Sequence, residues 1–237
     1  MTKSRAKPDA RGFGHVRTWI FDLDNTLYPS SCNLFAQVDV RMGEYVSKLL
    51  DIPYAEAKAL QKQYYWEHGT TLAGLMRIHK VDAPEFLAYV HDIDYSPVQA
   101  APDLAAAIAA LPAQKLIFTN GSRDHALAVT DRLGITGLFD ATFDITDARF
   151  VPKPRAEAYD HFLAAHGFDP KSAAMFEDLP GNLQAPHDLG MTTVLVHSDL
   201  DDHPIYRDIK DWKQLPEHIH HETDDLAGFL GGLREEV

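Results

Sequence analysis

The sequence predicts an α/β fold, a doubly wound parallel sheet with an all-helical domain inserted after its first strand. Three observations lead to this prediction. Five short apolar runs alternate with helical patterns, as in repeated strand–helix–strand units. One long stretch, residues 30–101, has helical periodicity only. Polar residues follow several of the apolar runs, and open α/β sheets bind ligands at the carboxyl ends of their strands.

The expected strands are short and apolar. The first is Thr18-Trp19-Ile20-Phe21, which ends directly before Asp22. Such a run is typical of a strand that is buried on both faces of a parallel sheet. Four later segments share this character, at residues 115–119, 141–144, 173–176 and 192–196. Helical patterns separate them, at residues 104–111, 124–133, 155–166 and 182–189. Three of these helices stop at a glycine that can form the C-cap, namely Gly134, Gly167 and Gly190.

The inserted stretch contains four helical patterns, at residues 34–50, 55–67, 71–79 and 84–90. We expect the chain to return to the sheet near residues 97–102. The predicted domains are therefore a core formed by residues 1–29 and 102–237, and a helical domain formed by residues 30–101. The remaining segments are expected to be a frayed start (1–11), an edge strand near 218–221 and a last helix over 224–233.

Composition and charge restrict the partners. The 237 residues include 22 basic and 35 acidic side chains, and the formal net charge is −13. Such a charge repels nucleic-acid polymers and anionic membranes on average, whereas a small anionic substrate remains possible where local cations bind it. The single cysteine, Cys32, excludes an internal disulfide and fits a reducing, cytoplasmic location. No run approaches the ~18 apolar residues of a membrane span, and no apolar segment of a signal peptide follows the basic start. The sequence leaves open whether the chain is a monomer or a homodimer.

Two acids, Asp22 and Asp24, follow the first strand. An extended chain would place both carboxylates on the same side, where they repel one another unless a cation lies between them or one is protonated. Mg²⁺ suits this position because it prefers carboxylate oxygens. A carboxylate can accept a phosphoryl group, and a second acid can transfer the protons. We therefore expect Asp22 to be the nucleophile and Asp24 the acid/base. The alternative is a pair of solvated loop acids before the turn at Asn25-Thr26.

Two further groups fit phosphoryl transfer. Thr119 and Asn120 end the second strand, where a hydroxyl and an amide can hold phosphate oxygens. Lys153 lies between two prolines that stiffen the backbone, so its ammonium can be held as a point charge for phosphate and for Asp22. Without the other groups, Thr119-Asn120 would be interpreted as a turn and Lys153 as part of an ordinary loop.

Acids also follow the fourth strand. Glu177 and Asp178 come directly after the run 173–176, and Asn182 follows about one helical turn later. They offer further oxygen ligands for a metal, although acids at a strand end are often N-caps. Taken together, these residues provide a nucleophile, an acid/base, a phosphate clamp, a cation and metal ligands, the parts that phosphoryl transfer requires.

These motifs resemble those of the haloacid dehalogenase-like hydrolase superfamily, and the resemblance extends from about residue 16 to 197. It implies a Rossmann-like catalytic core with a helical cap that closes over the site. It also implies Mg²⁺ bound by Asp22, the backbone carbonyl of Asp24 and Asp178, with Glu177 and Asn182 as candidates for its outer shell. Dehalogenases usually lack an acid at the position of Asp24, so the resemblance favours a phosphatase.

Other segments resemble the pyrimidine 5'-nucleotidase subfamily, among them Asp24-Asn25-Thr26-Leu27-Tyr28-Pro29, Tyr64-Tyr65 and His91-Asp92-Ile93-Asp94-Tyr95. The resemblance implies a nucleoside 5'-monophosphate substrate, UMP or CMP first. Pro186 interrupts the helix after Asn182 and departs from the pattern. A sugar-phosphate or phosphoglycolate-type phosphatase, a phosphomutase on the same core and a non-enzymatic phosphate-binding module remain as alternatives.

The inserted domain is expected to select the leaving group. Its candidate residues, with Tyr28 of the first turn, are Tyr65, Arg77 and His79. Arg77 and His79 lie two apart on a helix, about 200° around its axis, so both cannot easily face one ligand. A surface arginine and a core-packed aromatic cluster are the plainer interpretations of Arg77 and of the tyrosines.

Overall fold

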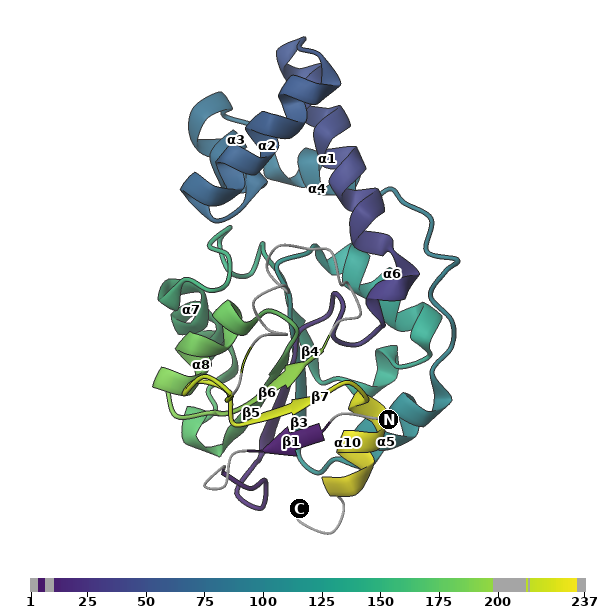
Figure 1. Ribbon diagram of the computed structural model, residues 1–237, viewed down its shortest axis with the longest axis vertical. Helices are drawn as coiled ribbons and strands as arrows, with labels where there is room; N and C mark the ends of the chain where they lie inside the picture. Colours follow the sequence, from purple (N-terminus) through teal and green to yellow (C-terminus); the bar gives the residue numbers. More distant parts are fainter. Residues whose placement is uncertain (1–3, 7–10, 198–211, 213, 234–237) are drawn as a thin grey trace.

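A computed structural model describes residues 4–6, 11–197, 212 and 214–233 of the chain. It contains a seven-stranded sheet with the order β1-β7-β6-β5-β2-β3-β4 (Figure 1). The strands are β1 (Ser4–Ala6), β2 (Thr18–Phe21), β3 (Gln114–Phe118), β4 (Ala141–Phe143), β5 (Ala173–Glu177), β6 (Thr192–Val196) and β7 (His221–Thr223). The pairings from β4 to β7 are parallel, and β1 joins β7 antiparallel. The predicted α/β fold with a doubly wound parallel sheet is confirmed.

Side chains of β2 alternate between two cores. Trp19 and Phe21 enter a cluster that includes Leu104 of helix α5 (Pro102–Ala110). Ile20 enters the opposite cluster with Phe162 of helix α7 (Ala156–His166). Helices α6 (Arg123–Leu133) and α10 (Leu226–Gly232) cover the first face, and α8 (Gln184–Asp188) lies with α7 on the second. Burial on both faces explains why the central strands are apolar throughout.

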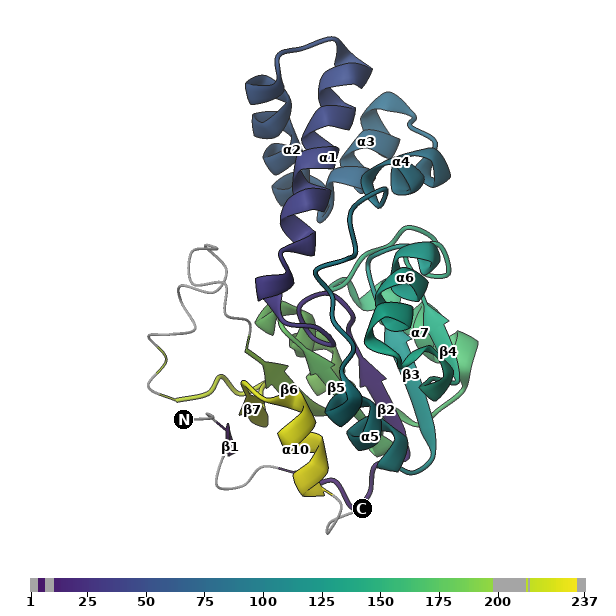
Figure 2. The same cartoon turned by 90° about the vertical axis from the view of Figure 1, so that its right-hand side faces the viewer.

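Four helices occupy the stretch between β2 and α5, and they lie together beyond the carboxyl ends of the strands (Figure 2). They are α1 (Leu34–Leu50), α2 (Tyr54–His68), α3 (Thr71–His79) and α4 (Ala83–Val90). No strand is assigned between residues 22 and 113, all of which are described. Their apolar residues form a separate cluster that includes Val46, Leu75 and Phe86. Ile145 of the core also belongs to this cluster, so the helical layer packs onto the core.

Several predicted elements, two of them near the ends of the chain, need correction. Residues 4–6 form strand β1 within the segment expected to be frayed, because the open edge of β7 provides backbone hydrogen-bond partners. The last strand begins at His221 rather than near residue 218. The predicted helix over 182–189 is divided into a 3₁₀ segment (Pro180–Leu183) and the short α8. Pro186 lies within α8 and lacks the amide hydrogen that a longer helix would use there.

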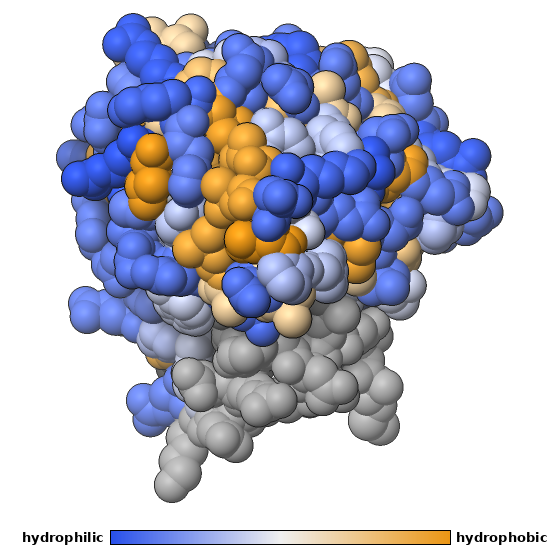
Figure 3. Space-filling model, turned by 90° about the horizontal axis from the view of Figure 1, so that it is seen from above, coloured by the Kyte–Doolittle hydropathy of each residue, from blue (hydrophilic) through white to orange (hydrophobic). Residues whose placement is uncertain are grey.

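Figure 3 views the molecule from the end formed by the inserted helices, where apolar patches lie among polar side chains. Val40, Leu49 and Ile78 are among the exposed apolar residues of these helices. None of the helices in the described part of the chain is long and apolar enough to cross a membrane.

Candidate active site

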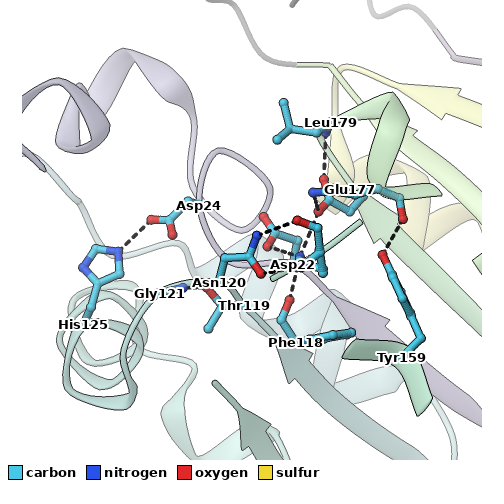
Figure 4. A network of polar contacts seen from close by, with 12 residues as sticks. Asp22, Asp24, Phe118, Thr119, Asn120, Gly121, His125, Tyr159, Glu177 and Leu179 are labelled. Carbon is cyan, nitrogen blue, oxygen red and sulfur yellow. Dashed lines mark hydrogen bonds and ion pairs between the residues drawn. The ribbon is translucent and has the colours of Figure 1, made fainter. Parts of the chain in front are cut away.

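The predicted residues of the core meet at the carboxyl ends of β2, β3 and β5 (Figure 4). Asp22 follows β2, and its amide donates a hydrogen bond to the carbonyl of Phe176 on β5, at 2.9 Å. This bond continues the sheet pairing by one residue and fixes the backbone at Asp22. The side chain is buried, and Figure 4 shows it between Asp24 on one side and Glu177 on the other.

The ammonium of Lys153 is buried and has three acceptors. Its Nζ donates to Asp22 Oδ1 at 2.6 Å, to the carbonyl of Phe118 at 2.8 Å and to Glu177 Oε1 at 2.8 Å. An ammonium has three hydrogens, so all of them are used. Burial would lower the pKa of Lys153, but the charges of Asp22 and Glu177 outweigh it and raise the pKa. Lys153 is therefore a permanent positive charge beside Asp22.

Asn120 holds the backbone of Lys153 rather than its charge. Its Oδ1 accepts from the Lys153 amide at 2.9 Å, and its Nδ2 donates to the Lys153 carbonyl at 3.2 Å. This two-point clamp joins the end of β3 to the loop before α7. The phosphate-binding role expected for Asn120 stays a prediction, because the amide serves this clamp in the structure. The hydroxyl of Thr119 is buried and accepts from the Gly121 amide at 2.9 Å, which tightens the turn after β3.

The acids around Asp22 form a group that fits a hard divalent cation. Asp22, Glu177 and Asp178 offer one carboxylate oxygen each, and these oxygens all lie within 4.8 Å of one another. All three residues are buried. Burial raises the pKa of Asp22 to about 7 against the attraction of Lys153, and Glu177 and Asp24 add to the rise. A second cation at this place would therefore relieve a local excess of negative charge.

Within this group, Glu177 is already engaged. Its Oε1 accepts from Lys153 and from Asn182 Nδ2, the latter at 2.6 Å, and its Oε2 accepts from the Leu179 amide at 2.7 Å. The predicted proximity of Asn182 to the acids is thus explained by a bond to Glu177. Tyr159 in turn donates to the carbonyl of Asn182 at 2.6 Å. Glu177 therefore holds Lys153 in place, and its oxygens lie in the same group of three acids that could hold a metal.

Asp24 has different neighbours from Asp22. Its Oδ1 accepts from the hydroxyl of Tyr28 at 2.6 Å and contacts Nε2 of His125 at 2.7 Å. Burial alone would raise the pKa of Asp24, but His125, by charge and hydrogen bond, and Tyr28, by hydrogen bond, hold it at about 2. Tyr28, predicted to act in specificity, is thus a buried partner of Asp24.

Sequence reasoning did not identify His125. It lies in the first turn of α6, three residues after the N-cap Ser122 and 101 residues after Asp24. Its Nδ1 contacts the hydroxyl of Tyr95 at 2.9 Å, and its ring stacks on His91 with centroids 4.5 Å apart. A signal was available in its position, because His125 follows the polar turn 119–122 at a strand end.

The sequence matches the family described as haloacid dehalogenase-like hydrolase over residues 16–190. This chain is a haloacid dehalogenase-like hydrolase. It is 28% identical over 197 residues to "Phosphate metabolism protein 8" of Saccharomyces cerevisiae, a match that covers 76% of this chain. The match covers only 61% of that relative's length.

Solved structures share the fold of this haloacid dehalogenase-like hydrolase. An L-2-haloacid dehalogenase is similar with a TM-score of 0.54 and 16% identity, covering 92% of this chain and 99% of its own. A HAD phosphatase from Thermococcus onnurineus is similar with a TM-score of 0.53 and 17% identity, covering 80% and 90%. Both phosphatases and dehalogenases are therefore among the proteins with this architecture.

The three candidate residues on the inserted helices of this hydrolase have different surroundings. Tyr65 of α2 is close enough to the site that, after burial, the charges of Glu177 and Asp178 raise its pKa. Arg77 is exposed on α3. His79 contacts the hydroxyl of Tyr64 at 2.7 Å within the inserted helices. The specificity roles of Tyr65, Arg77 and His79 stay predictions.

Proposed function

We propose that this haloacid dehalogenase-like hydrolase is a Mg²⁺-dependent phosphomonoesterase in which Asp22 is the phosphoryl acceptor. The observation that carries the proposal is that two acids close in sequence, Asp22 and Asp24, have different partners. Asp22 faces Lys153 and Asp178, whereas Asp24 is fixed apart by His125 and Tyr28. Asp22, beside Lys153, is thereby suited to act as the nucleophile, and Asp24 is suited to transfer protons.

In the first proposed step, a carboxylate oxygen of Asp22 attacks phosphorus and the bond from phosphorus to the ester oxygen breaks. That oxygen keeps the electron pair and takes a proton from Asp24, so the alcohol leaves neutral. In the second step, Asp24 takes a proton from water as the water oxygen bonds to phosphorus. The bond between phosphorus and Asp22 then breaks and releases phosphate. Lys153 neutralises charge on the phosphoryl oxygens throughout, and Thr119 provides a hydroxyl to them.

The donor set supports Mg²⁺, which when bound supplies Lewis-acid stabilisation of the phosphoryl oxygens. Asp22 and Asp178 are the side chains proposed to hold it, together with the carbonyl of Asp24. Glu177 and Asn182 are proposed to form the outer shell, because they orient one another and Lys153.

A specific observation favours phosphoester hydrolysis over dehalogenation. A halide leaves without a proton, so a dehalogenase with the same nucleophile needs no acid at the position of Asp24. Here that acid is present, and two further buried side chains are committed to holding it. The leaving group that suits this arrangement is an alkoxide, which must be protonated.

The substrate is proposed to be a nucleoside 5'-monophosphate, with UMP and CMP first. We propose residues 30–101 as a cap that selects the leaving group and residues 1–29 and 102–237 as the catalytic core. Tyr65 of the cap supports this division, because the charges of Glu177 and Asp178 act on it and raise its pKa. Sugar-phosphate and phosphoglycolate-type substrates are the alternative, and a panel of UMP, CMP, glucose 1-phosphate and phosphoglycolate separates the two.

The deciding experiment is phosphate release from this panel by wild type and Asp22→Asn, each with Mg²⁺ and with EDTA. We expect wild type with Mg²⁺ to be active and EDTA to abolish its activity. The rate of phosphate release by Asp22→Asn should be lower by at least about a thousandfold, because the amide is no nucleophile. Full activity of Asp22→Asn would exclude the covalent route, and full activity in EDTA would exclude the metal. Tight binding of a panel compound without turnover would instead support a binding module.

A further inference from the structure

The two oxygens of the Asp24 carboxylate have different surroundings. Tyr28 and His125 both contact Oδ1, at 2.6 and 2.7 Å. Oδ2 lies toward the turn after β3, because a Cβ built on Gly121 would be 3.6 Å from Oδ2 and 3.2 Å from Thr119 Oγ1. The oxygen that faces the proposed phosphate-binding turn is therefore the one that neither Tyr28 nor His125 contacts.

The hydrogen positions around His125 follow from its partners. Tyr95 donates its single hydroxyl hydrogen to the carbonyl of His91 at 2.9 Å. Its oxygen can then only accept from His125, so Nδ1 of His125 carries a hydrogen. Nε2 lies 2.7 Å from a carboxylate oxygen, a distance that requires a hydrogen between the two atoms. Tyr95 thus sets the orientation in which His125 meets Asp24.

The residues that hold His125 come from the segment that returns from the inserted helices to α5. His91 follows α4, stacks on the His125 ring at an interplanar angle of 15° and bonds Ser122 Oγ at 2.9 Å. Tyr95 lies four residues later, and its ring is tilted against His125 with centroids 5.6 Å apart. A side chain of the core is therefore aimed by the chain that leads back from the cap.

We propose that His125 is a positioning residue for Asp24, that Tyr95 aims it, and that together they leave Oδ2 as the oxygen that exchanges a proton with the substrate. This inference rests on the proposed function. Because Tyr28 and His125 both contact Oδ1, the Asp24 oxygen that faces the substrate is Oδ2, and Asp24 gives up its proton from there. The proton passes to the leaving oxygen as the ester bond breaks and the bond between Asp22 and phosphorus forms. His125 contacts no reacting atom and acts only through Asp24.

A purely structural role for the same side chains makes a different prediction. If His125, Tyr95 and His91 only stabilise the return segment, their loss lowers stability or activity equally for every substrate. If they position the acid, the loss depends on how strongly the leaving group needs a proton. Phenyl phosphate and 4-nitrophenyl phosphate separate these cases, because they share a shape but 4-nitrophenol is the much stronger acid and leaves without help.

The experiment compares kcat/KM for both esters, which reports the first chemical step, in wild type and five variants. In His125→Ala we expect a loss of about a hundredfold on phenyl phosphate and a much smaller loss on 4-nitrophenyl phosphate. His125→Gln, whose amide can reach the place of Nε2, is expected to recover most of the loss, whereas His125→Asn, whose shorter amide reaches only the place of Nδ1, is not. Tyr95→Phe keeps the ring and is expected to show the same substrate dependence more weakly. Tyr89→Phe, which removes a hydroxyl bonded to Lys48 on the cap, is the matched control and should match wild type.

The outcomes distinguish the inference from the function on which it rests. Equal losses on both esters, or equal recovery by Gln and Asn, would overturn the positioning role while the phosphatase stands. If wild type releases phosphate from neither ester nor from the panel above, the proposed function fails and the inference with it. Should His125→Ala not fold, Tyr95→Phe decides the question, because it removes one oxygen and leaves the packing in place.

Discussion

Asp22 and Asp24 are two residues apart and yet have opposite electrostatic surroundings. Burial raises the pKa of Asp22 to about 7, although Lys153 opposes the rise. At Asp24, His125 and Tyr28 outweigh burial and hold the pKa at about 2. The difference arises from which strand or helix each side chain meets, because Asp22 faces β5 and Asp24 faces α6. A nucleophile must be ionised and a general acid protonated. The proposed roles therefore need a bound cation that lowers the pKa of Asp22 and a bound phosphoryl group that raises the pKa of Asp24.

His91 allows a test of how burial changes the pKa of a single residue and, through it, the stability of the protein. Burial, aided by the neighbouring His125, lowers its pKa to about 3 against the opposing charge of Asp24. An unfolded histidine titrates near ~6.5, so the unfolded chain binds the extra proton first. The contribution to stability is complete above that pH and is lost as the pH falls toward 3.

We therefore expect the free energy of unfolding of wild type to fall by about 1 kcal/mol more than that of His91→Asn between pH 7 and 5.5. The asparagine amide can keep the contact with Ser122 but does not titrate. Urea denaturation of both proteins at the two pH values measures the difference. Parallel pH profiles would show that His91 is not held neutral.

At the scale of elements, α2 and α3 pack closely because α3 has a glycine at the contact. A Cβ on Gly74 would lie 2.6 Å from both Cβ and Cγ of Tyr64 and 2.9 Å from the His68 ring. The first two atoms are near the backbone of α2 and cannot move without shifting that helix. The glycine thus sets how near the two helices approach.

We expect Gly74→Ala to destabilise the protein by about 1–3 kcal/mol through overpacking, less the ~1 kcal/mol that alanine gains in a helix. Gly231→Ala in α10 is the matched control, because nothing lies within 4 Å of its Cβ position, and it should be neutral or slightly stabilising. Thermal unfolding measures both. A stabilised Gly74→Ala would mean that the two helices are free to separate.

The elements whose bounds follow from the sequence are those with a local cause. Helices α1 and α3 and strand β6 span their predicted residues, since amphipathic spacing or a continuous apolar run defines them. Strand β1 has no such pattern and forms only because β7 leaves an open edge. In the site, the strand-end acids and Lys153 could be predicted because parallel strands bring their ends together. The position of His125 after the polar turn 119–122 was a signal for the site. Its link to Asp24 could not be predicted, because it is a contact across 101 residues that only the packing of α6 creates.

At the scale of the whole molecule, the inserted helices contact the core on two sides of the site. One side is the return segment, where Tyr95 and His91 meet His125. On the other side, Nη2 of Arg155 donates to the carbonyl of His68, at the turn between α2 and α3, at 3.0 Å. In the proposed phosphatase, these contacts hold the cap over the acids.

Removing the second contact should weaken closure without altering the chemistry. The bond is exposed, so its loss is worth about 1 kcal/mol, and we expect Arg155→Ala to lower kcat/KM by up to about fivefold. Arg17→Ala is the control, because Arg17 bonds backbone carbonyls at the opposite end of β2. Steady-state kinetics on the best substrate of the panel measures both. Identical values for Arg155→Ala and Arg17→Ala would show that this contact has no part in closure.

The clamp of Asn120 on the Lys153 backbone has a consequence for the full catalytic cycle. When Asp22 is phosphorylated in the proposed reaction, its carboxylate loses its own charge, and a lysine held by that charge alone would shift toward the phosphoryl oxygens. Lys153 is anchored instead through its peptide, its bond to the Phe118 carbonyl and its ion pair with Glu177. None of these anchors changes as the phosphoryl group arrives or departs. Lys153 therefore keeps its position relative to the phosphorus atom while the bond between phosphorus and Asp22 forms and breaks.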